Sequence, residues 1–152
     1  MDRGRAAGGV CVAAVVAVLA GCGGSDTTAQ FKSGYNSVRT ELNQTGQAIA
    51  QEISQAPKQT DAQVSASFHS LAQRYSAQVA KLKKLNPPSS VSTEWKKVTD
   101  AATKLDSDLS AISSAAGAHN SAATQKAAAS LAANATALTQ AIAPVKQKLG
   151  LQ

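Results

Sequence analysis

Apolar residues recur at intervals of three and four residues in four separate blocks of this sequence. Because an α-helix has about 3.6 residues per turn, this spacing places the apolar side chains of each block on one helix face. A β-strand would instead alternate apolar and polar residues at every second position. The pattern therefore predicts an all-α fold with four helices, at residues 31–56, 61–85, 91–116 and 121–149.

Residues that break or cap helices separate the first blocks. Pro57 ends the first block because its ring removes the backbone N–H that a helix needs. Thr60 and Gln63 have the capping-box spacing that starts a second helix. Pro87 and Pro88 force the turn after it, because proline disfavours a helical conformation in the preceding residue.

The later boundaries rest on glycine and asparagine. Gly117 is expected to take the left-handed conformation after the third helix, and Asn120 or Ser121 to cap the fourth. Gly150 closes the fourth block. Pro144 lies inside that block and is expected to kink or locally unwind the helix.

Four helices of similar length joined by short connections predict antiparallel neighbours, and hence an up-down-up-down four-helix bundle. The fourth block is rich in alanine, so it forms a helix readily but offers little bulk for packing. A pair of helical hairpins that completes its core only as a dimer is therefore an alternative, and the oligomeric state stays open. The end of the bundle rich in alanine must either pack closely or leave a gap.

Residues 1–21 have the three parts of a secretory signal peptide. Arg3 and Arg5 lie before an apolar run from Val10 to Ala20, and small residues follow. That run is shorter than the roughly 18–20 apolar residues that a membrane-spanning helix needs. We expect residues 1–21 to be removed on export.

The run closes on Leu19-Ala20-Gly21-Cys22, which resembles the lipobox of bacterial prolipoproteins. The resemblance implies cleavage between Gly21 and Cys22, and a lipid on Cys22 that holds the protein on the cell membrane, facing outside the cytoplasm. Acylation of the new amino terminus (a palmitate, for example) stays open. A cleaved secretory signal with an incidental cysteine and an uncleaved anchor are the alternatives.

Cys22 would be the sole cysteine after cleavage, because Cys11 leaves with the signal peptide and no disulfide partner remains. Residues 22–30 contain Gly23, Gly24 and Ser25 and are expected to form a flexible tether. The chain resembles small alanine-rich helical lipoproteins of unknown function from high-GC bacteria. This resemblance is specific over residues 1–24 and rests on pattern and composition over the bundle.

The formal charge of the chain is +6, and Asp2, Arg3 and Arg5 supply +1 of it, so residues 22–152 carry +5. This modest charge, with few aromatic residues, argues against nucleic acid as a partner. In the predicted topology eight lysines map to the tethered end, where they form a hypothetical membrane-facing basic collar or a solvated rim. These are Lys32, Lys81, Lys83, Lys84, Lys96, Lys97, Lys146 and Lys148.

The sequence carries no motif that indicates catalysis, a metal or another cofactor. His69 and His119 lack the further ligands of a metal site. We therefore expect a lipid-anchored, non-catalytic module that acts through contact with the membrane or with an envelope protein. The alternative is a carrier of a small apolar ligand in a bundle-core pocket lined by Tyr75 and Trp95.

Overall fold

The computed structural model describes residues 24–151, and their regular structure is helical, with no strand in that range. The four long helices are α1 (Gly24–Gln55), α2 (Asp61–Lys84), α3 (Ser92–Gly117) and α4 (Ser121–Leu149). Two single 3-10 turns, η1 (Ala56–Lys58) and η2 (Ser89–Val91), precede α2 and α3. The predicted all-α fold of four packed helices is confirmed. None of these helices is long and apolar enough to cross a membrane.

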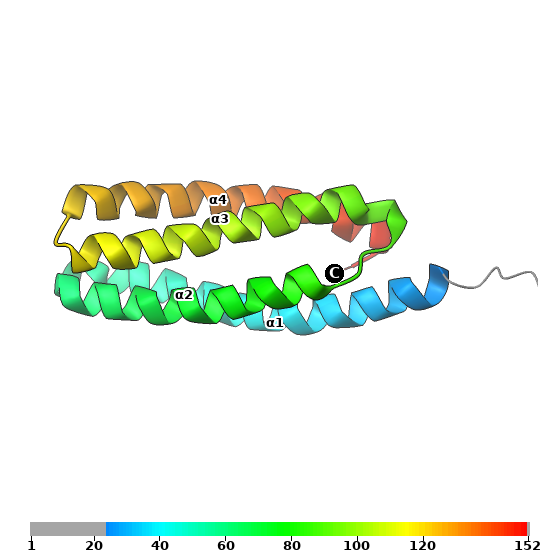
Figure 1. Cartoon of the computed structure of the whole chain (residues 1–152), viewed down its shortest axis with the longest axis horizontal. Coiled ribbons are helices and arrows are strands. Elements are labelled where there is room, and N and C mark those ends of the chain that lie inside the picture. The colour runs from blue at the N-terminus through cyan, green and yellow to red at the C-terminus, as the bar shows by residue number, and fades with distance from the viewer. Residues whose placement is uncertain (1–23, 152) are drawn as a thin grey trace, which may run out of the picture.

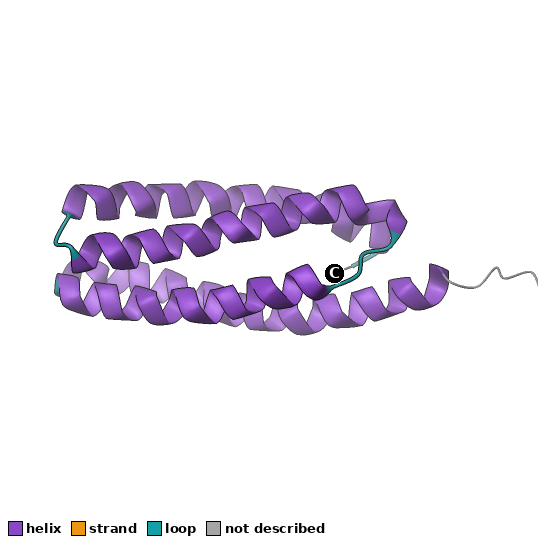
Figure 2. Cartoon of the chain, in the orientation of Figure 1, coloured by secondary structure: helices purple, strands orange, loops and turns teal. Residues whose placement is uncertain are grey.

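The helices lie side by side along one long axis (Figure 1). The α1–α2 and α3–α4 connections lie at one end, which we call the far end. The α2–α3 connection, the start of α1 and the C-terminus lie at the other, which we call the near end. The connections are short compared with the helices (Figure 2). This arrangement brings the last turns of α2 and α4 to the same end as the first turns of α3.

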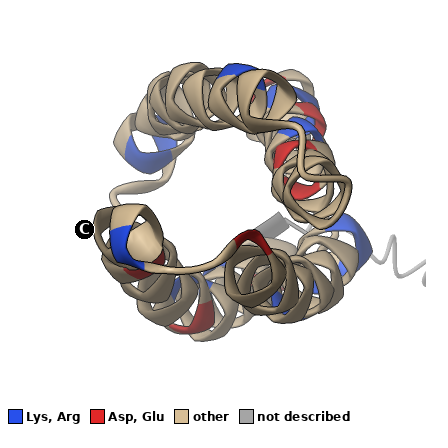
Figure 3. Ribbon diagram, turned by 90° about the vertical axis from the view of Figure 1, so that its left-hand side faces the viewer, with Lys and Arg blue, Asp and Glu red and all other residues tan. Residues whose placement is uncertain are grey.

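The helices contact one another unequally. α3 packs extensively against both α4 and α2, and α2 packs less extensively against α1. α1 and α4 make almost no close approach. Seen along the bundle axis, the four helices form a ring (Figure 3), and contacts close that ring on three sides but not between α1 and α4.

The core is built from the predicted apolar stripes. Its most completely buried large side chains are Phe31, Thr45, Phe68, Leu82, Val91, Val98, Leu109, Ile112 and Val145. At the near end Trp95 packs edge-to-face on Phe31, with ring centroids 4.8 Å apart, and on Tyr35 at 5.9 Å. Such aromatic pairs contribute about 0.5–1.5 kcal/mol beyond the burial of their area, so this cluster holds α1 against α3.

Three of the predicted helix boundaries are confirmed by their hydrogen bonds or conformation. The Thr60 hydroxyl accepts from the Gln63 backbone N–H at 3.3 Å, and the Gln63 side chain accepts from the Thr60 N–H at 2.9 Å. The Asn120 side chain accepts from the Ala123 N–H at 3.0 Å. Gly150 ends α4 in the left-handed conformation, with φ of +61°.

The expected left-handed Gly117 is wrong. α3 continues through Gly117, and His119 takes the positive φ of 53° instead. Gly117 serves packing between α2 and α3, because a Cβ there would lie 3.0 Å from the Ser65 hydroxyl oxygen. Its missing side chain therefore permits a close approach rather than a turn.

Two further expectations about helices differ from the structure. α1 begins at Gly24, so the expected tether is helical over residues 24–30. Gly24 is the one strong helix breaker there, and Asp26 in the first turn favours the helix dipole. α4 remains helical through Pro144, so the local unwinding that was one of the two expected effects does not occur. The adjacent Val145 is almost fully buried, which offsets the lost hydrogen bond. The signal peptide, Gly21 and Cys22 lie outside the described residues.

Candidate binding groove between helices α1 and α4

A groove of about 1010 Å³ runs along the open side of the bundle, between α1 and α4. Small-molecule sites are typically clefts of about 300–1,000 Å³, so this groove is as large as the largest of them. Its walls come from α1 and α4, and its floor from α2 and α3. The floor residues are Tyr75, Leu82, Val98, Leu105 and Leu109.

The α1 wall is formed by the second half of its apolar stripe. The first half of the stripe, from Phe31 to Val38, is buried. Beyond it Leu42 and Ile49 are only half-buried, and Ile53 is 45% exposed. Full burial of such a side chain contributes about 1.5–3 kcal/mol, so these residues leave stabilisation unused in the isolated chain.

The α4 wall is low because alanines occupy much of it. Ala132 and Ala135 line the groove and are exposed, whereas Leu138 and Ile142 are half-buried. Small side chains let α4 lie close to α3, which is the most extensive helix contact in the molecule. The same small side chains are too short to reach α1, and this leaves the groove open.

The floor carries one unsatisfied polar group. Tyr75 is 4% exposed, and its hydroxyl has no hydrogen-bond partner within residues 24–151. Burial raises the pKa of this hydroxyl well above its usual range, and the nearby Asp106 carboxylate raises it further. A neutral hydroxyl is therefore enclosed beneath an apolar groove, and it lacks an acceptor within the described residues.

A buried polar pair fixes α1 on α2 beside the groove. The Gln78 side-chain amide donates to the Thr45 hydroxyl at 2.8 Å and to the Glu41 carbonyl oxygen at 3.2 Å. Thr45 and Gln78 are 1% and 4% exposed. The donor belongs to α2 and both acceptors belong to α1, so these bonds fix how α1 is rotated about its own axis. In this rotation the branched side chains of α1 point toward the groove.

Gly46 forms a notch in the α1 wall. A Cβ built there would meet nothing within 4 Å, whereas one at Gly34 would lie 2.6 Å from Leu85 Cδ2. Close packing inside the described structure thus accounts for Gly34 but leaves Gly46 without a steric reason. Glycine within a helix also permits a ligand to approach the backbone closely.

Charge along the groove is uneven. Arg39 and Lys146 are the ionised side chains among its lining residues, and no carboxylate of the described chain lines it. Burial raises the pKa of the Tyr35 hydroxyl in the same wall, and the positive charge of Arg39 opposes this shift. The groove therefore combines an apolar floor with a positive rim.

A smaller groove of about 450 Å³ continues toward the far end, and Ile53 lines both. Ala116 and Ala128 line this part, together with Phe68 and Ile112. Of the two outcomes expected for the alanine-rich end, the structure therefore shows a gap. The side-chain amide oxygen (Oε1) of Gln59 in its wall is buried without a hydrogen-bond partner in the described chain.

The two residues predicted to line a pocket are separated by the structure. Tyr75 lies in the groove floor, but Trp95 does not line the groove. Trp95 instead fills the core at the near end, between Phe31 and Tyr35. The core is therefore filled at Trp95, which the sequence predicted to line a pocket.

The predicted collar lysines are mostly exposed, and three of them form ion pairs. Lys81 bonds Glu41 and Lys148 bonds Glu94, both at 2.7 Å, and Lys96 bonds Asp100 at 2.8 Å. The hydrogen bond from Lys148 lowers the pKa of the Glu94 carboxyl. At a distance these three carboxylates cancel the charges of three of the eight collar lysines. Each pair contributes only about 0–1 kcal/mol to stability.

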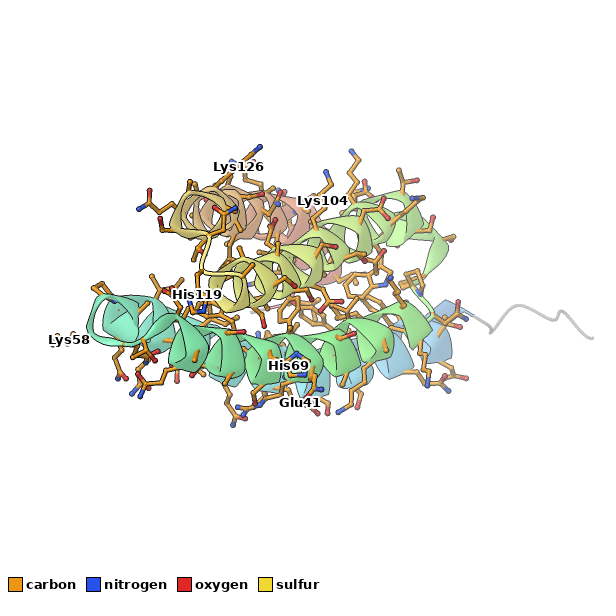
Figure 4. All side chains as sticks on the ribbon, turned by 60° about the vertical axis from the view of Figure 1, so that its left-hand side comes forward. Glu41, Lys58, His69, Lys104, His119 and Lys126 are labelled. Carbon is orange, nitrogen blue, oxygen red and sulfur yellow. The ribbon has the colours of Figure 1, made fainter. Side chains whose placement is uncertain are left out.

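The two histidines take separate partners. His119 lies 2.9 Å from the Asp61 carboxylate, and His69 lies 3.0 Å from the Gln73 side-chain nitrogen (Figure 4). No group of three or more His, Cys, Asp or Glu side chains within residues 24–151 is arranged to hold a metal ion.

Sequence reasoning missed most of the groove. It placed Leu42, Ile49 and Ile53 on an apolar stripe and expected them to be core, and it gave no role to Arg39 or Gly46. The one signal in the sequence was the low bulk of the fourth stripe. Comparison with protein-family models, with curated proteins and with solved structures found no match to this chain.

Proposed function

We propose that this protein is a membrane-tethered, non-catalytic binding module that holds an elongated apolar molecule in the groove between α1 and α4. One observation carries the proposal: branched apolar side chains of both helices face a groove of about 1010 Å³ instead of each other. A cleft of this volume with a mainly apolar lining and a few polar groups is typical of ligand-binding sites.

The tether in this proposal rests on the Leu19–Cys22 motif. Residues 1–21 are removed, Cys22 carries the lipid, and the bundle follows an up-down-up-down antiparallel order on the outer side of the cell membrane. Its near end then faces the lipid headgroups. A Cys22→Ala variant is expected to stay unprocessed and to lose incorporation of labelled lipid, and normal maturation of that variant would contradict the tether.

The groove is tested with a neutral apolar dye, Nile red, whose fluorescence rises when it leaves water. All dye measurements use the full-length chain carrying Cys22→Ala, which lacks the residue that would be lipidated. Ala135 and Ala137 are both exposed on α4, but only Ala135 lines the groove. We expect Ala135→Trp to weaken dye binding at least tenfold, a change of about 1.4 kcal/mol, and Ala137→Trp to leave it unchanged. Equal dye binding by both variants would show that the dye binds elsewhere.

A second candidate occupant is a helix of an envelope protein, favoured by the 45% exposure of Ile53 at the groove edge. Capture from the native envelope by the anchored protein tests this function. A partner that is lost with Ala135→Trp and kept with Ala137→Trp would support it. A partner kept by both variants would exclude the groove as its binding site.

A further inference from the structure

We infer that the groove between α1 and α4 takes a lipid with one acyl chain and an anionic head, and that the head lies at Arg39 and Lys146. This inference rests on the proposed function and adds the chemical class and the direction of the ligand. Two features of the groove carry it: where its charges lie and how far its apolar walls extend from them.

The two cations lie toward the near end of the groove. Lys146 is in the last turn of α4, and Lys148, two residues further on, reaches Glu94 near the start of α3. Tyr35, one turn before Arg39, packs on Trp95, which follows Glu94. Arg39 and Lys146 therefore flank the same part of the groove, and an anionic group between them would gain from both charges.

Apolar walls extend from this positive region toward the far end. On α1 the wall continues through Leu42 and Ile49 to Ile53, and on α4 through Ile142 to Leu131. At about 1.5 Å per residue, Arg39 and Ile53 are roughly 21 Å apart along the helix. Half the hydrocarbon thickness of a bilayer is roughly 15 Å, so the groove is long enough for one extended acyl chain. The polarity of the walls matches a charged head followed by an apolar tail.

The floor of the groove is a closed core. Three of its residues, Leu82, Val98 and Leu109, are 0–1% exposed although they line the groove. The occupant therefore lies against the walls of α1 and α4 rather than on these side chains. The two cations at one end of apolar walls favour a lipid with an anionic head over a helix or a second copy of this chain as that occupant.

Midway along the groove, the notch and the unpartnered hydroxyl lie at similar heights. The bond between Gln78 and Thr45 places the turn of α2 that holds Tyr75 beside the turn of α1 that holds Gly46. Gly46 lets a methylene group of the ligand approach the α1 backbone. The Tyr75 hydroxyl at this height is fully enclosed, so the acyl chain passes over it without a hydrogen bond.

The test compares three probes with the same twelve-carbon chain: laurate, dodecanol and dodecylamine. Each displaces Nile red from the full-length chain carrying Cys22→Ala. We expect laurate to compete at least tenfold better than dodecanol, and dodecylamine to compete least well. The variant pair Arg39→Gln with Lys146→Met should reduce the advantage of laurate to less than about threefold, and Lys146→Met alone should give an intermediate value.

The matched control is Lys104→Met with Lys126→Met. These lysines extend away from the bundle (Figure 4) and do not line the groove. The control should keep the full advantage of laurate, which separates a local head site from the overall positive charge.

The remaining outcomes overturn the inference in distinguishable ways. Equal competition by laurate and dodecanol, blocked in both cases by Ala135→Trp, would overturn the anionic head but keep the groove as an apolar site. A laurate preference that survives the Arg39 and Lys146 substitutions would overturn the position of the head. Absence of any dye binding would overturn the proposed function itself. A concentration-dependent dimer that Ala135→Trp dissociates, without competition by laurate, would identify a second copy as the occupant.

Discussion

The amide of Gln78 donates a 2.8 Å hydrogen bond to the hydroxyl of Thr45, and this buried pair joins α2 to α1 at the level of the groove. Both side chains are almost fully enclosed, so neither can exchange its partner for water. The pair holds α1 in the rotation that turns Leu42 and Ile49 toward α4. The open side of the bundle is therefore a consequence of how α1 is fixed on α2.

Removing the acceptor of this pair should destabilise the protein. Thr45→Val keeps the shape of the side chain but leaves the Gln78 amide with only the Glu41 carbonyl. We expect a loss of about 1–3 kcal/mol in the free energy of unfolding, measured by urea denaturation. The double variant Thr45→Val with Gln78→Leu should recover part of this loss, because no buried donor is then left unpaired.

The control for that prediction is Thr40→Val. Thr40 is exposed and its hydroxyl bonds only the Asn36 carbonyl within α1. The control should change the free energy of unfolding by less than about 0.5 kcal/mol. A Thr45→Val protein as stable as Thr40→Val would show that the pair does not hold α1.

Tyr75→Phe should be tolerated by the free protein and by the complex. It removes a hydroxyl that has no partner within the described residues, so the free protein should keep its stability or gain up to about 1 kcal/mol. Displacement of Nile red by laurate should change less than about twofold, because the hydroxyl is enclosed and the laurate carboxylate lies at Arg39 and Lys146. A clear loss of stability in the free protein would contradict the picture of an unsatisfied hydroxyl.

The same variant isolates an alkaline pH dependence. The folded-state pKa of Tyr75 is raised above the unfolded value of about 10, so the folded protein holds this proton more tightly. Its contribution to stability is complete below about pH 10 and is lost as pH rises further, where the unfolded chain releases the proton first. The free energy of unfolding of Tyr75→Phe should fall less steeply above pH 10 than that of the parent chain. Parallel curves would show that Tyr75 titrates normally.

The two α1 glycines should respond unequally to alanine. Gly46→Ala should stabilise the protein by about 1 kcal/mol, because the new Cβ meets open space and alanine favours the helix. Gly34→Ala gains the same helix propensity, but its new Cβ would lie 2.6 Å from Leu85 Cδ2, so the Leu85 side chain must move. Its net effect should therefore be smaller or opposite in sign. If thermal unfolding showed equal stabilisation by Gly46→Ala and Gly34→Ala, the Leu85 side chain would have moved without a loss of stability.

The basic collar predicts selective binding to anionic membranes. The test compares two double variants that change the net charge equally. The collar pair is Lys83→Glu with Lys97→Glu, and the far pair, at the far end, is Lys58→Glu with Lys126→Glu. At about 1 kcal/mol per lysine near the surface, the collar pair should weaken sedimentation with phosphatidylglycerol vesicles at least tenfold, and the far pair little. Phosphatidylcholine vesicles should bind neither variant. Equal losses in the two variants would leave the collar as a solvated rim.

The sequence predicted the positions of the helices along the chain better than the distances between the helices in space. The capping box at Thr60 and the left-handed Gly150 are local devices, and the corresponding boundaries followed from them. The start of α1 was missed because a Gly-Gly-Ser composition favours a linker, whereas the residues after Gly24 permit a helix. Local patterns thus located the elements to within a few residues in α2 and α4.

The groove could not be predicted in the same way. An apolar stripe shows which face of α1 turns inward, but not how closely another helix approaches it. That distance depends on the bulk of α4 and on the rotation set by Gln78 and Thr45, which are distant in sequence. Tyr75 lies in the floor of this groove, whereas Trp95, which was predicted to share a bundle-core pocket with it, packs in the core.

Nuclear magnetic resonance tests the occupied groove most directly. The full-length chain carrying Cys22→Ala is labelled on its Leu and Ile methyl groups and mixed with laurate. We predict intermolecular nuclear Overhauser effects from the laurate methylenes to Leu42, Ile49 and Ile53 of α1 and to Leu138 and Ile142 of α4, with the carboxyl end nearest Lys146. Contacts confined to other methyl groups, or no intermolecular contacts at saturating laurate, would contradict the groove as the binding site.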